Sequence, residues 1–226
     1  MGAATARLLA SHGAGMIWIA DRNSSNFETI KQEISDINPL TQVFTTELDV
    51  ANPKQVDDWV AAIVGKSGGV LHGAANVAGV SQPAFTLEKP AILAETDEDW
   101  ARVIDVNLNG IMYCTRAQVR VMVGMPSGSN PTIVNVASLA SLVRGPSAFA
   151  YGASKAACAH FTACVAKDVY PFGIRANTVS PGRSSTWGSS HRSFHCLSGS
   201  SLSLLTVPPH SHPSSLHPSL SIYETM

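Results

Sequence analysis

Three residues that could perform acid–base chemistry stand close together in the middle of the chain. Ser138 is followed after 13 residues by Tyr151 and, four residues further on, by Lys155. The run from Phe149 to Asp168 is rich in alanine, which predicts a helix, and residues four apart share one face of a helix. We therefore expect the Tyr151 phenol and the Lys155 ammonium to lie side by side.

A positive charge beside a phenol changes what that phenol can do. A free phenol has a pKa of about 10, too high for a useful base near neutrality, and a neighbouring ammonium favours the phenolate. Tyr151 would then exchange a proton with an alcohol or a carbonyl while Ser138 hydrogen-bonds the same oxygen. Each residue alone is also compatible with an ordinary role, as a surface serine, a half-buried tyrosine or a solvated lysine. The spacing Tyr-x-x-x-Lys by itself is common by chance. The added serine favours catalysis.

The residues before the serine indicate how it is placed. The β-branched run from Thr132 to Ala137 is typical of a buried strand, and Ser138 follows it directly. Open α/β sheets bind their ligands at the carboxyl ends of the strands. We therefore expect Ser138 to face Tyr151 and Lys155 across a cleft.

With these residues the sequence resembles the short-chain dehydrogenase/reductase family, from Gly2 to about Gly182. The resemblance implies a Rossmann-like α/β fold, a doubly wound parallel sheet with helices on both faces. It also implies hydride transfer between NAD(P) and a secondary alcohol or ketone. The catalytic residues would be Ser138, Tyr151, Lys155 and Asn107, with Asn107 holding a water for proton relay and Lys155 also binding the cofactor ribose.

One acidic residue bears on the choice of cofactor. Asp21 follows a short apolar run and lies 19 residues after Gly2. An acid about 20 residues after a glycine turn binds the adenosine ribose hydroxyls and disfavours a 2′-phosphate, which favours NAD. The adjacent Arg22 keeps NADP open, because a guanidinium binds phosphate well. Capping of the next helix is the alternative role for Asp21.

The resemblance implies further cofactor-binding residues beside Asp21, Tyr151 and Lys155. Val77 stands where the family's turn has a second asparagine. The residues implied are Gly2 as the last glycine of the phosphate-binding turn, Asp49 at the adenine, Asn76 at the cleft, and Pro181 and Gly182 beside the nicotinamide.

Compared with the family, the chain lacks the first strand and the C-terminal part that covers the substrate. The first strand would lie between 16–20 and 70–75, so we expect unpaired backbone groups there and impaired binding and turnover. Two alternatives stay open. The chain could act only by association with intact relatives, or it could be a fragment without function.

The composition changes abruptly after residue 182. We divide the chain into a partial cofactor-binding domain, 1–182, and a Ser/His/Pro-rich tail, 183–226. The tail shows no helical or strand period, which predicts disorder. Its histidines are irregularly spaced, which argues against a metal site; they are His191, His195, His210, His212 and His217.

The overall composition narrows the class of protein. The chain has 226 residues, 45% of them hydrophobic and 14% charged, which suits one α/β core. A net charge of −1 offers no footprint for nucleic acid or an anionic membrane, and no apolar run reaches transmembrane length. Without a visible signal peptide, and with cysteines lacking metal spacing, we expect a cytoplasmic protein with a small-molecule substrate. The family's helices, here 100–122 and 149–168, often pair between subunits.

Overall fold

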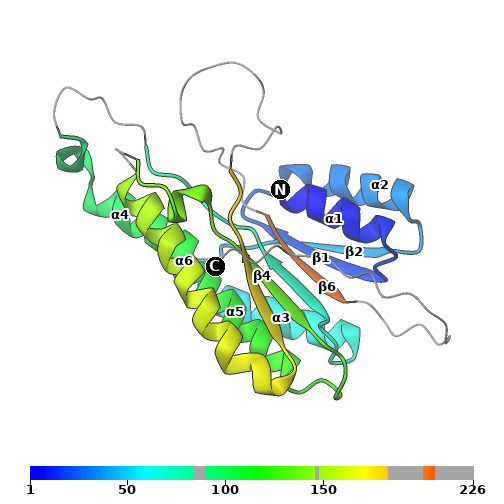
Figure 1. Ribbon diagram of the computed structural model, residues 1–226. Helices are drawn as coiled ribbons and strands as arrows, with labels where there is room; N and C mark the ends of the chain where they lie inside the picture. Colours follow the sequence, from blue (N-terminus) through cyan, green and yellow to red (C-terminus); the bar gives the residue numbers. More distant parts are fainter. Residues whose placement is uncertain (84–89, 146–147, 183–200, 207–226) are drawn as a thin grey trace.

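The computed structural model describes residues 1–83, 90–145, 148–182 and 201–206. A six-stranded sheet in the order β2-β1-β6-β3-β4-β5 has helices on both faces (Figure 1). Five of its strands run parallel to one another, as the sequence predicted. The strands are β1 Met16–Asp21, β2 Gln42–Glu47, β3 Gly73–Asn76, β4 Thr132–Val136, β5 Arg175–Val179 and β6 Ser201–Thr206.

Helix α3 shows how local sequence signals set the two ends of a helix. Asn52 caps α3 by accepting hydrogen bonds from the backbone of the first turn, Pro53 is its first residue, and Gly68 ends it with φ 67°. The helices are α1 Gly2–Ser11, α2 Phe27–Ile37, α3 Pro53–Ser67, α4 Asp97–Ile104, α5 Gly110–Met122 and α6 Phe149–Val169. Short helical turns are η1 Ser24–Asn26, η2 Ala91–Ala94, η3 Asp105–Asn109, η4 Leu139–Ser141 and η5 Tyr170–Phe172.

Two apolar clusters pack on opposite faces of the sheet, and β1 contributes to both. Ile17 and Ile19 join the cluster under α1 and α2, whereas Trp18 and Ala20 join the cluster under α3 and α5. This alternation follows from the two-residue period of a strand. The first five residues of β1, 16–20, are all apolar because both faces of the strand are covered.

One segment of the tail differs from the expectation, because it forms a strand at the centre of the sheet. We predicted no regular structure in 183–226, but Ser201–Thr206 forms β6 in the gap between β1 and β3. It runs antiparallel to both, pairing with Met16–Asp21 on one side and Gly73–Asn76 on the other. The unpaired edges predicted for β1 and β3 are therefore occupied, and the sheet is mixed rather than purely parallel. The tail histidines and Cys196 lie outside the described residues.

Two further observations concern partners and ligands. Within the described ranges, no helix has both the length and the apolar character needed to cross a membrane. The same part of the chain contains no cluster of three or more side chains suited to hold a metal ion.

The position of β6 leads to a prediction about stability. Leu204 pairs with Trp18 and Ala74, so its strand has a neighbour on each side. We expect Leu204→Pro to lower the free energy of unfolding by at least about 2 kcal/mol, because it removes a ladder N–H and leaves a buried carbonyl unpaired. Denaturant unfolding measures this change.

Leu204→Val is the matched control, because valine keeps the backbone N–H and favours strands. Its unfolding midpoint should stay close to that of the unmodified chain. If the proline variant unfolds at the same midpoint as well, the stability of β1 and β3 does not depend on β6.

Candidate active site

The structure brings the three predicted catalytic residues to the carboxyl end of β4. Ser138 lies two residues beyond the strand, and its Oγ accepts a hydrogen bond of 3.2 Å from the Ala140 N–H at the start of η4. Tyr151 and Lys155 lie one turn apart in α6, which packs against η4. The Lys155 Nζ is 5.8 Å from the centroid of the Tyr151 ring. Their predicted proximity is therefore present.

Lys155 is held from the strand side. Its side chain is only 3% exposed, and Nζ donates a hydrogen bond of 2.9 Å to the carbonyl oxygen of Val136, the last residue of β4. Because Val136 precedes Ser138 by only two positions, this contact brings the ammonium close to the serine. The loop after β3 approaches so closely that a Cβ on Gly79 would lie 3.2 Å from Lys155 Nζ and 3.3 Å from Asn107 Oδ1. Gly79 is therefore part of the site, although the sequence analysis did not single it out.

Asn107 has a different setting from the one predicted. The helix expected over 100–122 continues without a break from α4 to α5, but its residues Asp105–Asn109 adopt a π-helical turn. Asn107 is fully buried there, and its Oδ1 accepts from the Val80 N–H while its Nδ2 donates to the Val80 carbonyl and to Ser154 Oγ. Its side chain therefore clamps the segment after β3, and its role in a water relay stays a proposal.

The predicted adenosine-binding residues meet at the carboxyl ends of the strands. A small hollow there is lined by Asp21, Arg22, Asp49 and Ala78 from the ends of β1, β2 and β3, among other residues. Asp21 Oδ1 accepts a hydrogen bond of 2.9 Å from the Asn23 N–H, and Asp49 Oδ1 accepts one of 3.0 Å from the Ala51 N–H. Each acid thus shapes its own turn. Both acids line this hollow, so the structure brings together the two acidic residues that the resemblance assigns to the adenosine.

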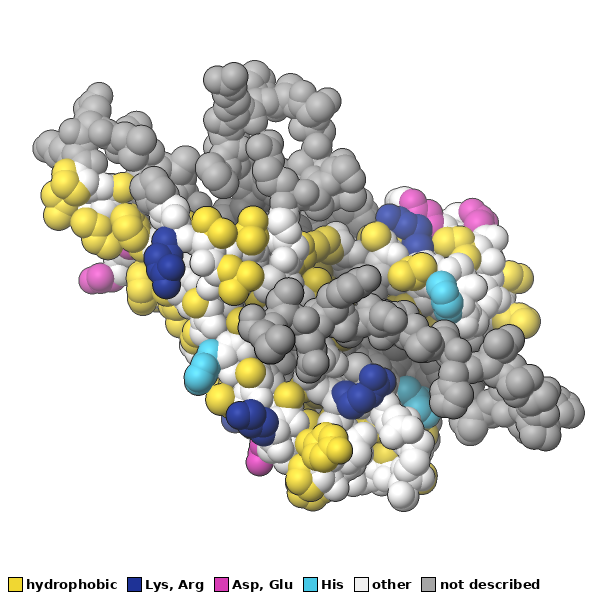
Figure 2. All heavy atoms as spheres, in the orientation of Figure 1, with side chains coloured by type: hydrophobic (Ala, Val, Ile, Leu, Met, Phe, Trp, Pro, Cys, Tyr) yellow, Lys and Arg dark blue, Asp and Glu magenta, His cyan; other side chains and the backbone are white. Residues whose placement is uncertain are grey.

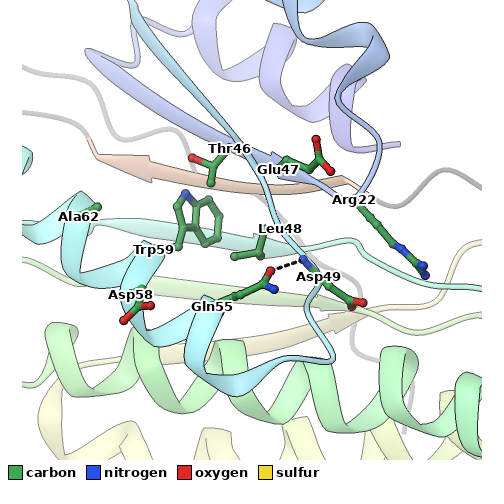
Figure 3. Close-up of a pocket in the computed structure, with 9 residues that line it drawn as sticks. All are labelled: Arg22, Thr46, Glu47, Leu48, Asp49, Gln55, Asp58, Trp59 and Ala62. Carbon is green, nitrogen blue, oxygen red and sulfur yellow. Dashed lines mark hydrogen bonds between the residues drawn. The ribbon is translucent and has the colours of Figure 1, made fainter.

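A larger cavity of about 610 Å³ continues from the same residues (Figure 3). It runs between the end of β2 and α3 and shares Arg22 and Asp49 with the small hollow. The Gln55 side chain accepts a hydrogen bond of 3.0 Å from the Asp49 N–H across it. The buried Nε1 of Trp59, on its wall, has no hydrogen-bond partner among the described residues.

Asn76 is placed differently from a residue that binds a cofactor through its side chain. It is 0% exposed and exchanges two hydrogen bonds, of 3.0 and 2.7 Å, with Gln118. It also donates one of 2.8 Å to Asn135, which donates to Thr162 of α6 at 3.0 Å. The network ties β3 and β4 to the helices beneath them. Sequence reasoning missed Gln118, Asn135 and Thr162, because no local pattern pairs residues so far apart.

The remaining predicted cofactor residues lie at the same end of the sheet, where the strands have their carboxyl ends. Gly2 is buried and begins α1, whose first turn has neither an acidic residue nor a side-chain cap. Such a helix start suits a phosphate group. The Pro181 carbonyl accepts a hydrogen bond of 2.9 Å from the Leu139 N–H, so Pro181 and Gly182 lie beside the Ser138 loop. These residues fit the nicotinamide cofactor implied by the resemblance.

Apolar side chains are exposed around the catalytic end. Leu142 and Val143 after η4 are 70% and 58% exposed, and Leu93 in η2 is 75% exposed. Figure 2 shows hydrophobic side chains gathered over the end of the molecule that carries η2 and α4.

Two cysteines near the site are unsuited to nucleophilic chemistry. Burial raises the pKa of the Cys114 thiol to about 12. Burial also raises the pKa of Cys158, one turn after Lys155, although the lysine opposes this shift. Because of their raised pKa values, both thiols stay protonated near neutrality. A protonated thiol is a poor nucleophile, since the thiolate is the reactive form.

Comparison with known proteins agrees with this geometry. The sequence profile of the family described as short chain dehydrogenase matches residues 1–193. A chanoclavine-I dehydrogenase of Penicillium roqueforti (strain FM164) is 50% identical over 186 residues, which cover 82% of this chain and 70% of that protein. One from Claviceps purpurea (strain 20.1) is 52% identical with the same coverage.

Solved structures with the same fold include enzymes of related chemistry. Levodione reductase is similar with a TM-score of 0.72 and 28% identity, covering 80% of this chain and 66% of that one. NAD⁺-bound xylitol dehydrogenase is similar with a TM-score of 0.67 and 28% identity, covering 80% and 65%. The chain thus spans just under two thirds of the length of these two solved proteins.

The close approach at Gly79 leads to a prediction. Gly79→Ala places a methyl group 3.2–3.3 Å from the polar ends of the buried Lys155 and Asn107, so these hydrogen-bonded side chains must shift to make room. We expect the free energy of unfolding to fall by about 1–3 kcal/mol, as is usual when a packed interior is overfilled. Urea unfolding measures it.

Gly65→Ala is the control, because a Cβ at this position in α3 meets nothing within 4 Å. In a helix this change should leave stability unchanged or raise it by up to about 1 kcal/mol. Equal behaviour of the two variants would contradict the close packing at Gly79.

Proposed function

Because the chain belongs to the short chain dehydrogenase family, we propose that it transfers hydride between a nicotinamide cofactor and an alcohol or the corresponding carbonyl compound. One observation carries most of the proposal. Lys155 is buried, anchored on the last carbonyl of β4 and placed beside the Tyr151 ring. A buried ammonium next to a phenol, with a serine two residues beyond its anchor, is suited to proton exchange with a substrate oxygen.

The proposed reaction divides the work between the residues and the cofactor. The bound nicotinamide supplies the hydride acceptor for oxidation of an alcohol. The Tyr151 oxygen takes the hydroxyl proton as the carbon–oxygen double bond forms. The Lys155 ammonium stabilises the negative charge of the phenolate form, and the Ser138 hydroxyl donates a hydrogen bond to the substrate oxygen. In the reverse direction Tyr151 returns the proton to the carbonyl oxygen.

The relatives suggest which substrate to test first. The sequence alone favoured a secondary alcohol and its ketone, whereas the relatives of about 50% identity are named as dehydrogenases of chanoclavine-I. We therefore propose an alcohol of the chanoclavine type as substrate. The exposed apolar side chains around the catalytic end are in keeping with an apolar molecule.

For the cofactor we propose NAD rather than NADP. Support comes from Asp21 at the end of β1, where a carboxylate accepts hydrogen bonds from ribose hydroxyls and repels a phosphate. Arg22 lines the same hollow and is the group that would favour NADP. The neighbouring solved structures include both NAD⁺-bound and NADP-bound proteins, so the family accommodates either.

Association between subunits is also proposed. The helices predicted for it correspond to α4 with α5 and to α6, and Trp100 on α4 is 42% exposed. A chain that shows no turnover but binds longer family members through these helices would favour the non-catalytic alternative.

The catalytic proposal is tested by Tyr151→Phe, which removes only the phenolic oxygen. We expect turnover of chanoclavine-I with NAD to fall at least ~10²-fold, a usual effect of losing a general acid or base. NADH binding, followed by fluorescence titration, should change less than about twofold. Full turnover in the variant, at whatever absolute rate the unmodified chain has, would exclude Tyr151 as the acid–base group.

The cofactor proposal is tested by Asp21→Ala. The unmodified chain should bind NADH more tightly than NADPH, and the variant should narrow that ratio by about tenfold, because the carboxylate next to the phosphate position is removed. Asp36→Ala, at an exposed position of α2, makes the same change in net charge and should leave the ratio unchanged. Tighter NADPH binding by the unmodified chain would show that Arg22 dominates.

A further inference from the structure

The N-cap residue of the helix that carries Tyr151 provides no capping side chain. Helix α6 begins at Phe149, and the residue before it, Ala148, has no side chain that can accept a hydrogen bond from the first turn. Tyr151 is the third residue of the helix, in the first turn, whose N–H groups lie outside the regular i→i−4 pattern of helix hydrogen bonds. The position of its side chain therefore depends on how this first turn is held.

A residue from a distant loop supplies an acceptor to this first turn. The Oε1 of Gln82, in the segment that follows β3, accepts a hydrogen bond of 3.0 Å from the Tyr151 N–H across a sequence separation of 69 residues. Gln82 is only 8% exposed. Its amide thus acts as a cap on α6 contributed from another part of the fold.

Glu95 determines which end of that amide faces the helix. The Gln82 Nε2 donates a hydrogen bond of 2.9 Å to Glu95 Oε2. An ionised carboxylate only accepts hydrogen bonds, so it selects the orientation in which Oε1 points at Tyr151. Burial and the nearby Asp99 raise the pKa of Glu95, whereas the bond from Gln82 opposes the shift. That bond therefore stabilises the ionised form of Glu95.

The segment that carries Gln82 is itself held in place. Val80 exchanges two backbone hydrogen bonds with the buried Asn107 side chain, and the Ser81 carbonyl accepts one of 3.1 Å from Arg102 Nη2. These contacts fix the position of Gln82 relative to α4 and to the π turn. An acceptor held this firmly can orient the turn that it caps.

We propose that Gln82 and Glu95 are positioning residues for Tyr151, acting through the backbone of the first turn of α6. The proposal rests on the proposed function, since positioning matters for a catalytic tyrosine. It goes beyond that function by assigning roles to two residues that are outside the Ser138–Tyr151–Lys155 set. Small errors in the placement of a reacting group reduce turnover more than binding.

The test combines a loss with an exchange of the two side chains. Gln82→Ala should lower kcat by about 10- to 100-fold and leave the KM for NAD within about twofold. Gln82→Glu alone should also lower kcat, because it places a carboxylate against Glu95. The double variant Gln82→Glu/Glu95→Gln restores one acceptor toward Tyr151 and one donor between the pair, so kcat should return to within about threefold.

The matched control is Gln32→Ala, which removes an exposed glutamine of α2 that also bonds to an acidic residue. It should leave kcat unchanged. Unchanged kcat in Gln82→Ala, or failure of the double variant to recover although it folds like the single variants, overturns the proposal. Loss of thermal stability in Gln82→Ala without a change in kcat shows a structural cap only, and likewise overturns it.

A second readout separates this proposal from the proposed function. If the unmodified chain has no turnover with NAD or NADP, the proposed function fails. The NMR resonances of the Tyr151 ring then test, independently of turnover, whether Gln82 positions this side chain. Shifts in Gln82→Ala that return in the double variant support the contact and its effect on the ring. Resonances that are the same in all variants overturn it.

Discussion

The burial of one ammonium group is the constraint on which the rest of the site depends. Lys155 is almost inaccessible to solvent, and a buried charge must be compensated by polar groups. The carbonyl of Val136 supplies one such group and thereby ties α6 to the end of β4. Because Ser138 follows that strand end by two residues, the same contact sets its distance from the helix. Gly79 packs closely over the ammonium, because a Cβ at this position would lie only 3.2 Å from the Lys155 Nζ.

A second set of buried polar contacts keeps the sheet and the helices in register. Asn76 of β3 and Asn135 of β4 bond to each other and to side chains of α5 and α6. Their donors and acceptors are matched within the network, which makes such a buried cluster rigid rather than costly. Asn107 continues this arrangement by clamping Val80. The predicted catalytic residues therefore rest on a framework of buried amide side chains.

The centre of the sheet shows how strongly unpaired strands require a partner. Both β1 and β3 present backbone groups toward the position between them, and an unsatisfied buried group costs on the order of 1–3 kcal/mol. The segment Ser201–Thr206 occupies that position in the antiparallel direction. At the site edge this direction places Ser201 beside Asp21. The carboxyl end of β1, with Asp21, therefore adjoins the start of a strand of opposite direction.

The sequence by itself determined the parts of the site that local geometry controls. The four-residue spacing of Tyr151 and Lys155, the strand leading to Ser138 and the acid at the end of β1 follow from helix and strand periods. The tertiary structure alone decided contacts between distant segments, such as Gln82 with Tyr151 and Asn76 with Gln118. It also decided the π turn at Asn107 and the pairing of β6. These depend on which surfaces meet after packing, and no period in the chain encodes that choice.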